Sequence, residues 1–215
     1  MGIRAVVLDI GETVLDRTRE YASWADFFGV PAHSFSAVFG AMIADGATVA
    51  QVIESFGDGR GFAELAAERG TTVTIEERDL YPDVRAAIAD LTTAGLTVGI
   101  VGNQPSSTSE QLEALDLGAD FVASSTTWGV AKPSAEFFAA VCAAAGAAPA
   151  EIVYVGDQLG NDVVAPTDAG LAAIRILRGP WGYLTSDPAV EARCLAVIHS
   201  LAELGEILGR RRADA

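Results

Sequence analysis

Three aspartates and one lysine follow or flank short apolar segments, in a combination suited to chemistry on an anion. Asp9 ends the segment "AVVL", Asp157 and Asp162 follow "IVYVG", and Lys132 stands in "GVAKP". Carboxylate oxygens are ligands that Mg²⁺ prefers, and one or two of them with a substrate phosphate complete its site. A lysine beside them neutralises a nucleophile and phosphoryl oxygens. We therefore expect a Mg²⁺ site next to a nucleophile.

Lys132 is the sharpest of these signals, because it is the only lysine in a chain that has 13 arginines. One lysine must fall somewhere among 215 positions, but its place directly before a proline and a helical pattern favours a role in the site. The blander interpretation of a single acid, Asp162 above all, is a residue that caps the following helix. That interpretation does not account for the whole set.

The elements that must position these residues alternate between strand and helix. Short apolar runs predict strands at Ala5–Asp9, Thr97–Val101, Phe121–Ala123, Ile152–Val155 and Ala172–Leu177. Helical patterns lie between them at Asp83–Ala94, Ser107–Leu115, Ala135–Ala145 and Asp162–Ala169. This alternation predicts an α/β fold, a Rossmann-like parallel sheet covered by helices on both faces. Ligands of such sheets bind beyond the carboxyl ends of the strands, where Gly102 and Asn103 also follow a strand.

Residues 15–80 interrupt this rhythm with mainly helical patterns and no convincing buried strand. We interpret them as an α-helical cap subdomain, inserted after the first strand and placed over the carboxyl edge of the sheet. The core domain then consists of residues 1–14 and 81–215.

Composition narrows the class of partner. The net charge is −15 and the pI about 4.3, so the surface repels phosphate backbones and anionic lipid. We therefore expect no nucleic-acid or membrane partner. Two cysteines without paired spacing, no visible signal peptide and no membrane-length apolar run predict a cytoplasmic protein. Oligomeric state is left open.

The order of these motifs resembles the haloacid dehalogenase superfamily, which is dominated by Mg²⁺-dependent phosphatases with an aspartyl nucleophile. Its first motif, Asp-x-Asp-x-Thr, matches Asp9 and Thr13, and its lysine motif matches Lys132. Its acidic motif, Gly-Asp with a second Asp, matches Asp157 and Asp162. The resemblance implies that Asp9 attacks phosphorus, that Lys132 is catalytic and binds phosphate with Gly102 and Asn103, and that Asp9, Gly11, Asp157 and Asp162 hold Mg²⁺.

Two positions depart from the family's pattern. Gly11 stands where the phosphatases usually have a second aspartate, and Gly102 where they usually have serine or threonine. The resemblance implies that the missing acid would protonate the leaving group, a transfer typically worth about 10²–10⁴-fold in rate. Glu12, Asp16 or a group of the cap is a candidate replacement. A substrate with a good leaving group, such as an acyl or aryl phosphate, needs that acid least.

The favoured prediction is Mg²⁺-dependent hydrolysis of a small phosphorylated metabolite. The first alternative is a catalytically impaired member that binds a phosphorylated ligand or a protein, as Gly11 and Gly102 suggest. The second is cleavage of a carbon–halogen or carbon–phosphorus bond, with Arg17 or Arg19 as the cap arginine that the dehalogenases use. The segment Arg178 to Tyr183 is more typical of a packed surface loop than of an aromatic lid.

Overall fold

The computed structural model describes residues 2–70 and 73–213 and has a six-stranded parallel sheet at its centre. The strand order is β3-β2-β1-β4-β5-β6. The strands are β1 (Ala5–Leu8), β2 (Thr97–Gly102), β3 (Phe121–Ser124), β4 (Ile152–Gly156), β5 (Ala172–Ile176) and β6 (Ala196–Ile198). The α/β class and the parallel sheet are confirmed. The sequence analysis missed β6, a three-residue edge strand that lies in the short apolar run Leu195–Ile198 and whose Val197 is 40% exposed.

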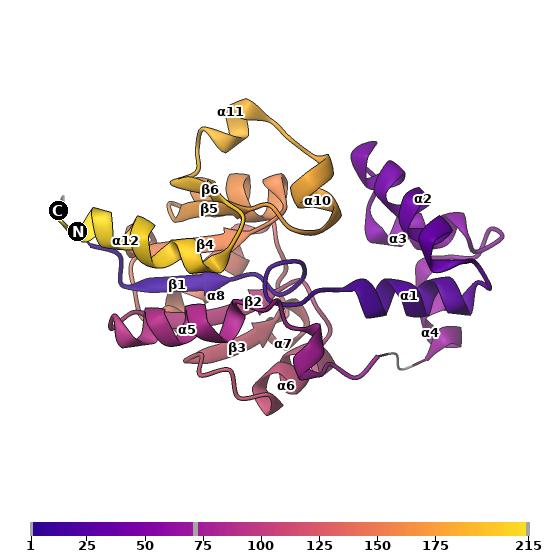
Figure 1. Ribbon diagram of the computed structural model, residues 1–215, viewed down its shortest axis with the longest axis horizontal. Helices are drawn as coiled ribbons and strands as arrows, with labels where there is room; N and C mark the ends of the chain where they lie inside the picture. The colour runs from indigo at the N-terminus through magenta and orange to yellow at the C-terminus, as the bar shows by residue number, and fades with distance from the viewer. Residues whose placement is uncertain (1, 71–72, 214–215) are drawn as a thin grey trace.

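Helices cover both faces of the sheet, and β1 shows how the sequence arranges this. Val6 and Leu8 face one way, into a core cluster shared with helices α5 and α12, while Val7 faces the other way, toward α8 and α9 (Figure 1). Side chains alternate between faces along a strand, so a strand with helices on both sides must be apolar throughout. The helices of this part are α5 (Val84–Thr93), α6 (Ser106–Ala114), α7 (Ser125–Trp128), α8 (Ala135–Ala145), α9 (Ala165–Asp168), α10 (Gly179–Leu184), α11 (Pro188–Glu191) and α12 (Leu204–Ala213).

Four helices between β1 and α5 form a separate bundle, which we call the helical module: α1 (Thr18–Phe27), α2 (Ala32–Ala44), α3 (Val49–Ser55) and α4 (Phe62–Arg69). It has its own core of aromatic and aliphatic side chains, among them Trp24, Phe35 and Leu65. No strand lies between residues 16 and 79 in the part that the structure describes. Figure 1 shows the module beyond the end of the sheet at which β1 finishes.

The chain enters and leaves this module through two adjacent segments. Leu15 and Leu80 form an antiparallel bridge, flanked by hydrogen bonds from Asp16 N to Asp79 O (2.8 Å) and from Tyr81 N to Val14 O (3.0 Å). The module is therefore joined covalently to the sheet through two adjacent backbone segments.

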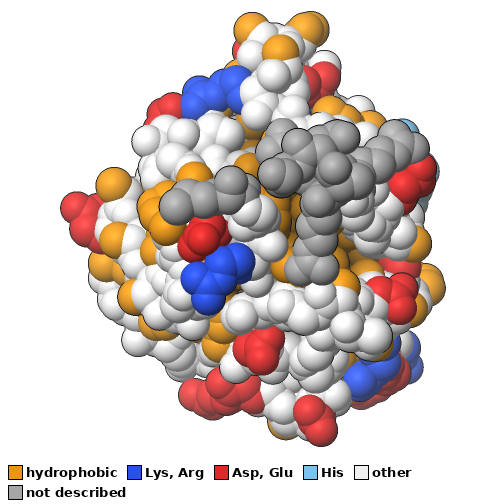
Figure 2. All heavy atoms as spheres, turned by 90° about the vertical axis from the view of Figure 1, so that its left-hand side faces the viewer, with side chains coloured by type: hydrophobic (Ala, Val, Ile, Leu, Met, Phe, Trp, Pro, Cys, Tyr) orange, Lys and Arg blue, Asp and Glu red, His pale blue; other side chains and the backbone are white. Residues whose placement is uncertain are grey.

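The opposite end of the molecule, where β1 begins and α12 lies, carries acidic, basic and hydrophobic side chains interspersed (Figure 2). No single described helix is long and apolar enough to span a membrane. Helices α1 and α2 pass such a test only together, and they are bent by 110° at the break between them.

Candidate active site

Asp9 follows β1 and lies at the carboxyl edge of the sheet, where its backbone N donates to Val155 O at 2.8 Å. Gly102 ends the neighbouring strand β2, and a Cβ placed there would lie 2.8 Å from Oδ1 of Asp9. A side chain at position 102 would therefore require the carboxylate of Asp9 to shift. Glycine here has a steric reason that the sequence alone did not show.

Lys132 lies between two of the predicted acids. Its Nζ is 2.6 Å from Oδ1 of Asp9 and 2.6 Å from Oδ1 of Asp162, and it lies 5.2 Å from the ring centre of Tyr154. Burial disfavours the ammonium, but the two carboxylates outweigh burial and raise the pKa of Lys132 well above its ordinary value. The side chain is thus a fixed cation against the proposed nucleophile.

Asn103 holds the backbone of Lys132 through two reciprocal hydrogen bonds. Lys132 N donates to Oδ1 of Asn103 at 2.8 Å, and Nδ2 of Asn103 donates to Lys132 O at 2.9 Å. This pairing fixes the loop before α8 to the end of β2. It identifies Asn103 as a positioning residue, and its predicted contact with phosphate stays a prediction.

Asp162 reaches the site from a π-helical turn, Leu159–Val164, which follows β4. Such turns are rare and occur often at functional sites. Its carboxylate packs so closely on Gly156 that a Cβ there would lie 2.4 Å from Cγ of Asp162. Gln158 N donates to its Oδ2 at 2.9 Å. Gly156 of the Gly-Asp motif therefore leaves room for Asp162. The carboxylate of Asp162 accepts hydrogen bonds both from Lys132 and from the backbone next to its own turn.

Asp157 is fully buried, and neither of its carboxylate oxygens has a hydrogen-bond partner among the described residues. Burial raises its pKa well above the ordinary value, and the charges of Asp162 and Asp9 add to this rise. One oxygen each of Asp9, Asp157 and Asp162 lie within 4.8 Å of one another. Buried polar groups are almost always satisfied, so the orphaned carboxylate and the all-oxygen cluster fit a hard divalent cation such as Mg²⁺.

Burial raises the pKa of Asp9 to about 6, a rise that Lys132 opposes and Asp162 increases. A divalent cation among the three acids would favour their ionised forms. The nucleophilic, anionic state of Asp9 therefore depends on its positive neighbours, of which Lys132 is the one the chain itself supplies.

A cavity of about 360 Å³ opens above these groups, and we call it the catalytic cavity. It is lined from both parts of the chain by Asp9, Gly11, Glu12, Arg17, Gly46, Ala47, Thr48, Val49, Asn103, Gln104, Lys132, Gln158, Asn161 and Trp181. Asp9, Gly11, Asn103 and Lys132 of the predicted site line it, whereas Gly102, Asp157 and Asp162 do not. Because segment 46–49 belongs to the helical module, the cavity lies between the module and the sheet.

Trp181 is a lining residue that the sequence analysis underrated. It lies on α10, in the segment that was expected to be a packed surface loop, and its ring meets that of Phe39 edge to face at 5.9 Å. Arg175, buried in β5, donates to Trp181 O at 3.1 Å and to Thr185 O at 2.6 Å, which fixes this segment. The aromatic residues of the segment Arg178 to Tyr183, which follows the fifth predicted strand, were the sequence signal for it.

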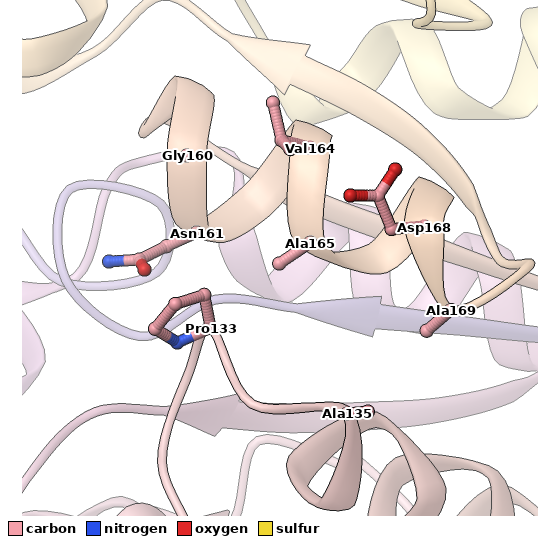
Figure 3. A pocket seen from close by; sticks show the side chains of 8 residues that line it. All are labelled: Pro133, Ala135, Gly160, Asn161, Val164, Ala165, Asp168 and Ala169. Carbon is pink, nitrogen blue, oxygen red and sulfur yellow. The ribbon is translucent and has the colours of Figure 1, made fainter.

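A second hollow of about 380 Å³ lies beside α8 and α9, and its lining is mostly small and apolar (Figure 3). Pro133, Asn161 and Asp168 line it, but Asp9, Asp157 and Lys132 do not. Asn161 also lines the catalytic cavity. The hollow therefore offers none of the charged groups of the catalytic cavity.

The carboxylates of Glu12 and Asp16, the candidate replacements for the missing acid, make hydrogen bonds to other groups. Glu12 has a left-handed backbone (φ 58°), and its Oε2 accepts a hydrogen bond from Tyr81 OH at 2.7 Å. Burial raises the pKa of Glu12 to about 7, against that hydrogen bond and the charge of Arg17. Oδ1 of Asp16 accepts from Thr18 N at 2.9 Å, and Asp16 does not line the catalytic cavity. Neither carboxylate occupies the space beside Gly11.

Comparison with known proteins places this geometry in a family. A model of the family described as haloacid dehalogenase-like hydrolase matches residues 3–170. The chain belongs to the haloacid dehalogenase-like hydrolases. It is 30% identical over 139 residues to the glyceraldehyde 3-phosphate phosphatase of Methanocaldococcus jannaschii, covering 62% of this chain and 58% of that protein. It is 31% identical over 131 residues to the phosphoserine phosphatase of Thermus thermophilus, covering 59% of this chain and 53% of that protein.

The matched region thus spans less than two thirds of the length of these curated relatives. Among solved structures, the hydrolase YfnB from Bacillus subtilis, bound to magnesium, has a TM-score of 0.71 at 18% identity, covering 97% of this chain and 99% of that one. A dehalogenase has a TM-score of 0.66 at 20% identity, covering 96% of this chain and 97% of that one. At these identities the likeness is one of fold. Phosphatases and dehalogenases share it, so the choice of reaction rests on the site.

Proposed function

We propose that this protein is a Mg²⁺-dependent phosphatase of a small phosphorylated metabolite, with Asp9 as the nucleophile. The observation that carries the proposal is the buried carboxylate of Asp157, which has no partner among the described residues and lies beside Asp9 and Asp162. Cleavage of a carbon–halogen bond by Asp9 does not need the carboxylate of Asp157, whereas a phosphatase uses this carboxylate to hold a cation. The phosphatases among the relatives agree with this choice.

In the proposed mechanism, an oxygen of Asp9 attacks phosphorus, and the bond from phosphorus to the leaving oxygen breaks. The product is an aspartyl phosphate, and water then cleaves its phosphorus–oxygen bond to release phosphate and restore Asp9. Lys132 keeps the attacking carboxylate oriented and adds a positive charge beside the phosphoryl oxygens. Asn103 acts on Lys132 and thereby on the same step. Asp9, Asp157, Asp162 and the carbonyl of Gly11 would hold Mg²⁺, which would supply charge neutralisation for the phosphoryl group.

The helical module is proposed as the cap of this enzyme, because its segment 46–49 lines the catalytic cavity together with Asp9 and Lys132. Trp181 of α10 lines the same cavity and packs against the core of the module. The strongly acidic composition suits an enzyme of the cytoplasm that takes small phosphorylated substrates rather than nucleic acid or lipid surfaces.

The test is phosphate release from a panel of phosphomonoesters and acyl phosphates, with Mg²⁺ and with EDTA, for the wild type and for Asp9→Asn. We expect release that needs Mg²⁺ and that falls to the background rate in Asp9→Asn. Release that is equal in the variant would exclude Asp9 as nucleophile. Absence of release from every substrate would favour the impaired, ligand-binding alternative, and halide release would favour the dehalogenase alternative.

A further inference from the structure

The space beside Gly11 is filled by the side chain of Arg17. A Cβ built on Gly11 would lie 3.2 Å from Cδ and 3.8 Å from Nη1 of Arg17. Nε2 of Gln104 would lie 3.4 Å from the same Cβ, so a side chain at position 11 would require Arg17 to shift by a few tenths of an ångström. The absence of a side chain at Gly11 and the position of the Arg17 side chain are therefore linked.

Two of the three guanidinium nitrogens of Arg17 are occupied. Nε donates to Oε2 of Glu20 at 2.8 Å, and Nη2 donates to Oε1 of Glu20 at 2.7 Å. Nη1 has no hydrogen-bond partner among the described residues. The fork with Glu20 fixes the plane of the guanidinium, and the remaining nitrogen is a donor held ready on the Gly11 side of the cavity.

Among the described residues, Arg17 and Lys132 are the positively charged side chains that line the catalytic cavity. Lys132 is bound to Asp9 and Asp162 on the β4 side of the nucleophile. Arg17 lies on the other side, next to Gly11. The cation that remains free to meet a substrate oxygen distant from Lys132 is therefore Arg17.

Arg17 also borders a larger cavity of about 520 Å³ between the helical module and the sheet, which we call the outer cavity. Arg17 and Gln104 line both cavities. The outer cavity has apolar walls such as Leu15 and Ile75 and hydroxyls such as Thr108. When the phosphoryl group of a substrate lies at Asp9 and its organic group lies in the outer cavity, the oxygen that joins the two lies near Arg17.

Resting on the proposed phosphatase function, we propose that Arg17 is a catalytic residue that binds the leaving oxygen of an organic phosphate whose alcohol or acyl part lies in the outer cavity. As the phosphorus–oxygen bond breaks, the electron pair goes to that oxygen and Nη1 donates a hydrogen bond to it. Arginine does not give up its proton. The oxygen therefore leaves as an oxyanion and takes a proton from water after it departs.

The test measures kcat/KM for a series of aryl phosphates whose leaving groups range from 4-nitrophenol to phenol. In Arg17→Gln we expect a loss of about 10²–10³-fold for phenyl phosphate and of under about tenfold for 4-nitrophenyl phosphate, because a good leaving group needs the charge least. Arg17→Lys keeps the charge and should recover part of the loss. The double variant Arg17→Gln/Glu20→Gln, which leaves no unpaired Glu20, should show the same dependence as Arg17→Gln.

Arg60→Gln is the matched control, since Arg60 lies in the helical module, pairs with Glu68 and lines neither the catalytic nor the outer cavity. It should keep the wild-type values across the series. An equal loss for all leaving groups in Arg17→Gln, or no loss, would overturn the proposal while Mg²⁺-dependent release by the wild type still supported the phosphatase. A wild type that releases phosphate no faster than Asp9→Asn would overturn both.

The place of the organic group is tested by narrowing the outer cavity with Ala67→Trp, because Ala67 lines it and does not line the catalytic cavity. We expect the KM for 1-naphthyl phosphate to rise by about tenfold, the equivalent of 1.4 kcal/mol, and that for acetyl phosphate to stay as in the wild type. An unchanged KM for both substrates would show that the organic group lies elsewhere.

Discussion

Asp83 and Asp157 are both withdrawn from solvent, but they have opposite surroundings. Three donors converge on Oδ2 of Asp83: the guanidinium of Arg178, the hydroxyl of Ser200 at 2.6 Å and the N–H of Leu201 at 2.9 Å. Asp157 has no donor on either oxygen among the described residues. Accordingly the pKa of Asp83 is lowered, despite its partial burial, and the pKa of Asp157 is raised by burial.

The comparison separates a structural acid from a functional one. At Asp83 the chain itself supplies three donors to one carboxylate oxygen, Oδ2, while Oδ1 has no hydrogen-bond partner among the described residues. The acid ties the linker at residues 80–83 to the segments after β5 and β6. At Asp157 the described residues supply no donor to either oxygen. Ionising a buried carboxyl without partners costs several kcal/mol, and this cost supports the proposal that a cation binds beside Asp157.

The largest effect is expected from Asp157→Asn. Removing a ligand of the proposed cation should lower Mg²⁺-dependent phosphate release by about 10³-fold, since a metal ion supplies several kcal/mol of charge stabilisation. Saturating Mg²⁺ should raise the melting temperature of the wild type, in line with about 2.7 kcal/mol at 100 times the Kd. It should leave the melting temperature of Asp157→Asn unchanged. A variant still stabilised by Mg²⁺ would place the cation away from Asp157.

A smaller effect is expected at Asn103, which acts through Lys132. Asn103→Ala removes both hydrogen bonds to the Lys132 backbone, and a displacement of about 1 Å at a catalytic group can cost about 10²-fold in kcat. Asn103→Asp keeps the acceptor for Lys132 N and should be less affected. Stabilisation by Mg²⁺ should persist in both variants. A raised KM with unchanged kcat would instead indicate that Asn103 binds phosphate directly.

The smallest effect is expected at Asp83, and it concerns stability alone. Asp83→Asn should lower the free energy of unfolding by about 2 kcal/mol at pH 7, because hydrogen bonds to a charged group are worth about 1.5–3 kcal/mol. The stabilisation by Mg²⁺ and kcat should stay at the wild-type level. Urea denaturation with and without Mg²⁺ measures the free energy of unfolding and the stabilisation by Mg²⁺.

The pH dependence of this difference follows from the pKa of Asp83. Burial raises that pKa, but the hydrogen bond from Ser200 and the charge of Arg178 outweigh it, so the folded value lies below the ordinary 3.8. The folded state thus favours the ionised acid, and its contribution is complete above pH 3.8 and is lost as the pH falls through the folded value. The gap between wild type and Asp83→Asn should therefore shrink at pH 3. An equal gap at pH 3 and pH 7 would contradict this assignment.

The sequence by itself determined five of the six strands, their order along the chain and the edge of the sheet at which the acids lie. Short apolar runs that alternate with helical patterns predict strands covered on both faces, and an acid directly after such a strand is expected at the carboxyl edge of the sheet. This reasoning placed Asp9, Asp157 and Asp162, and Lys132 was singled out as the only lysine of the chain. The structure brings all four together.

The tertiary structure decided which of the remaining residues meet. Lys132 lies 123 positions from Asp9 in the chain, and Trp181 reaches the cavity only because α10 packs on α2. The position of Arg17 over Gly11 and the lack of space at Gly102 are likewise contacts between side chains from separate elements. A sequence pattern reports the face on which a residue lies, whereas the identity of its neighbours is fixed only when the elements pack.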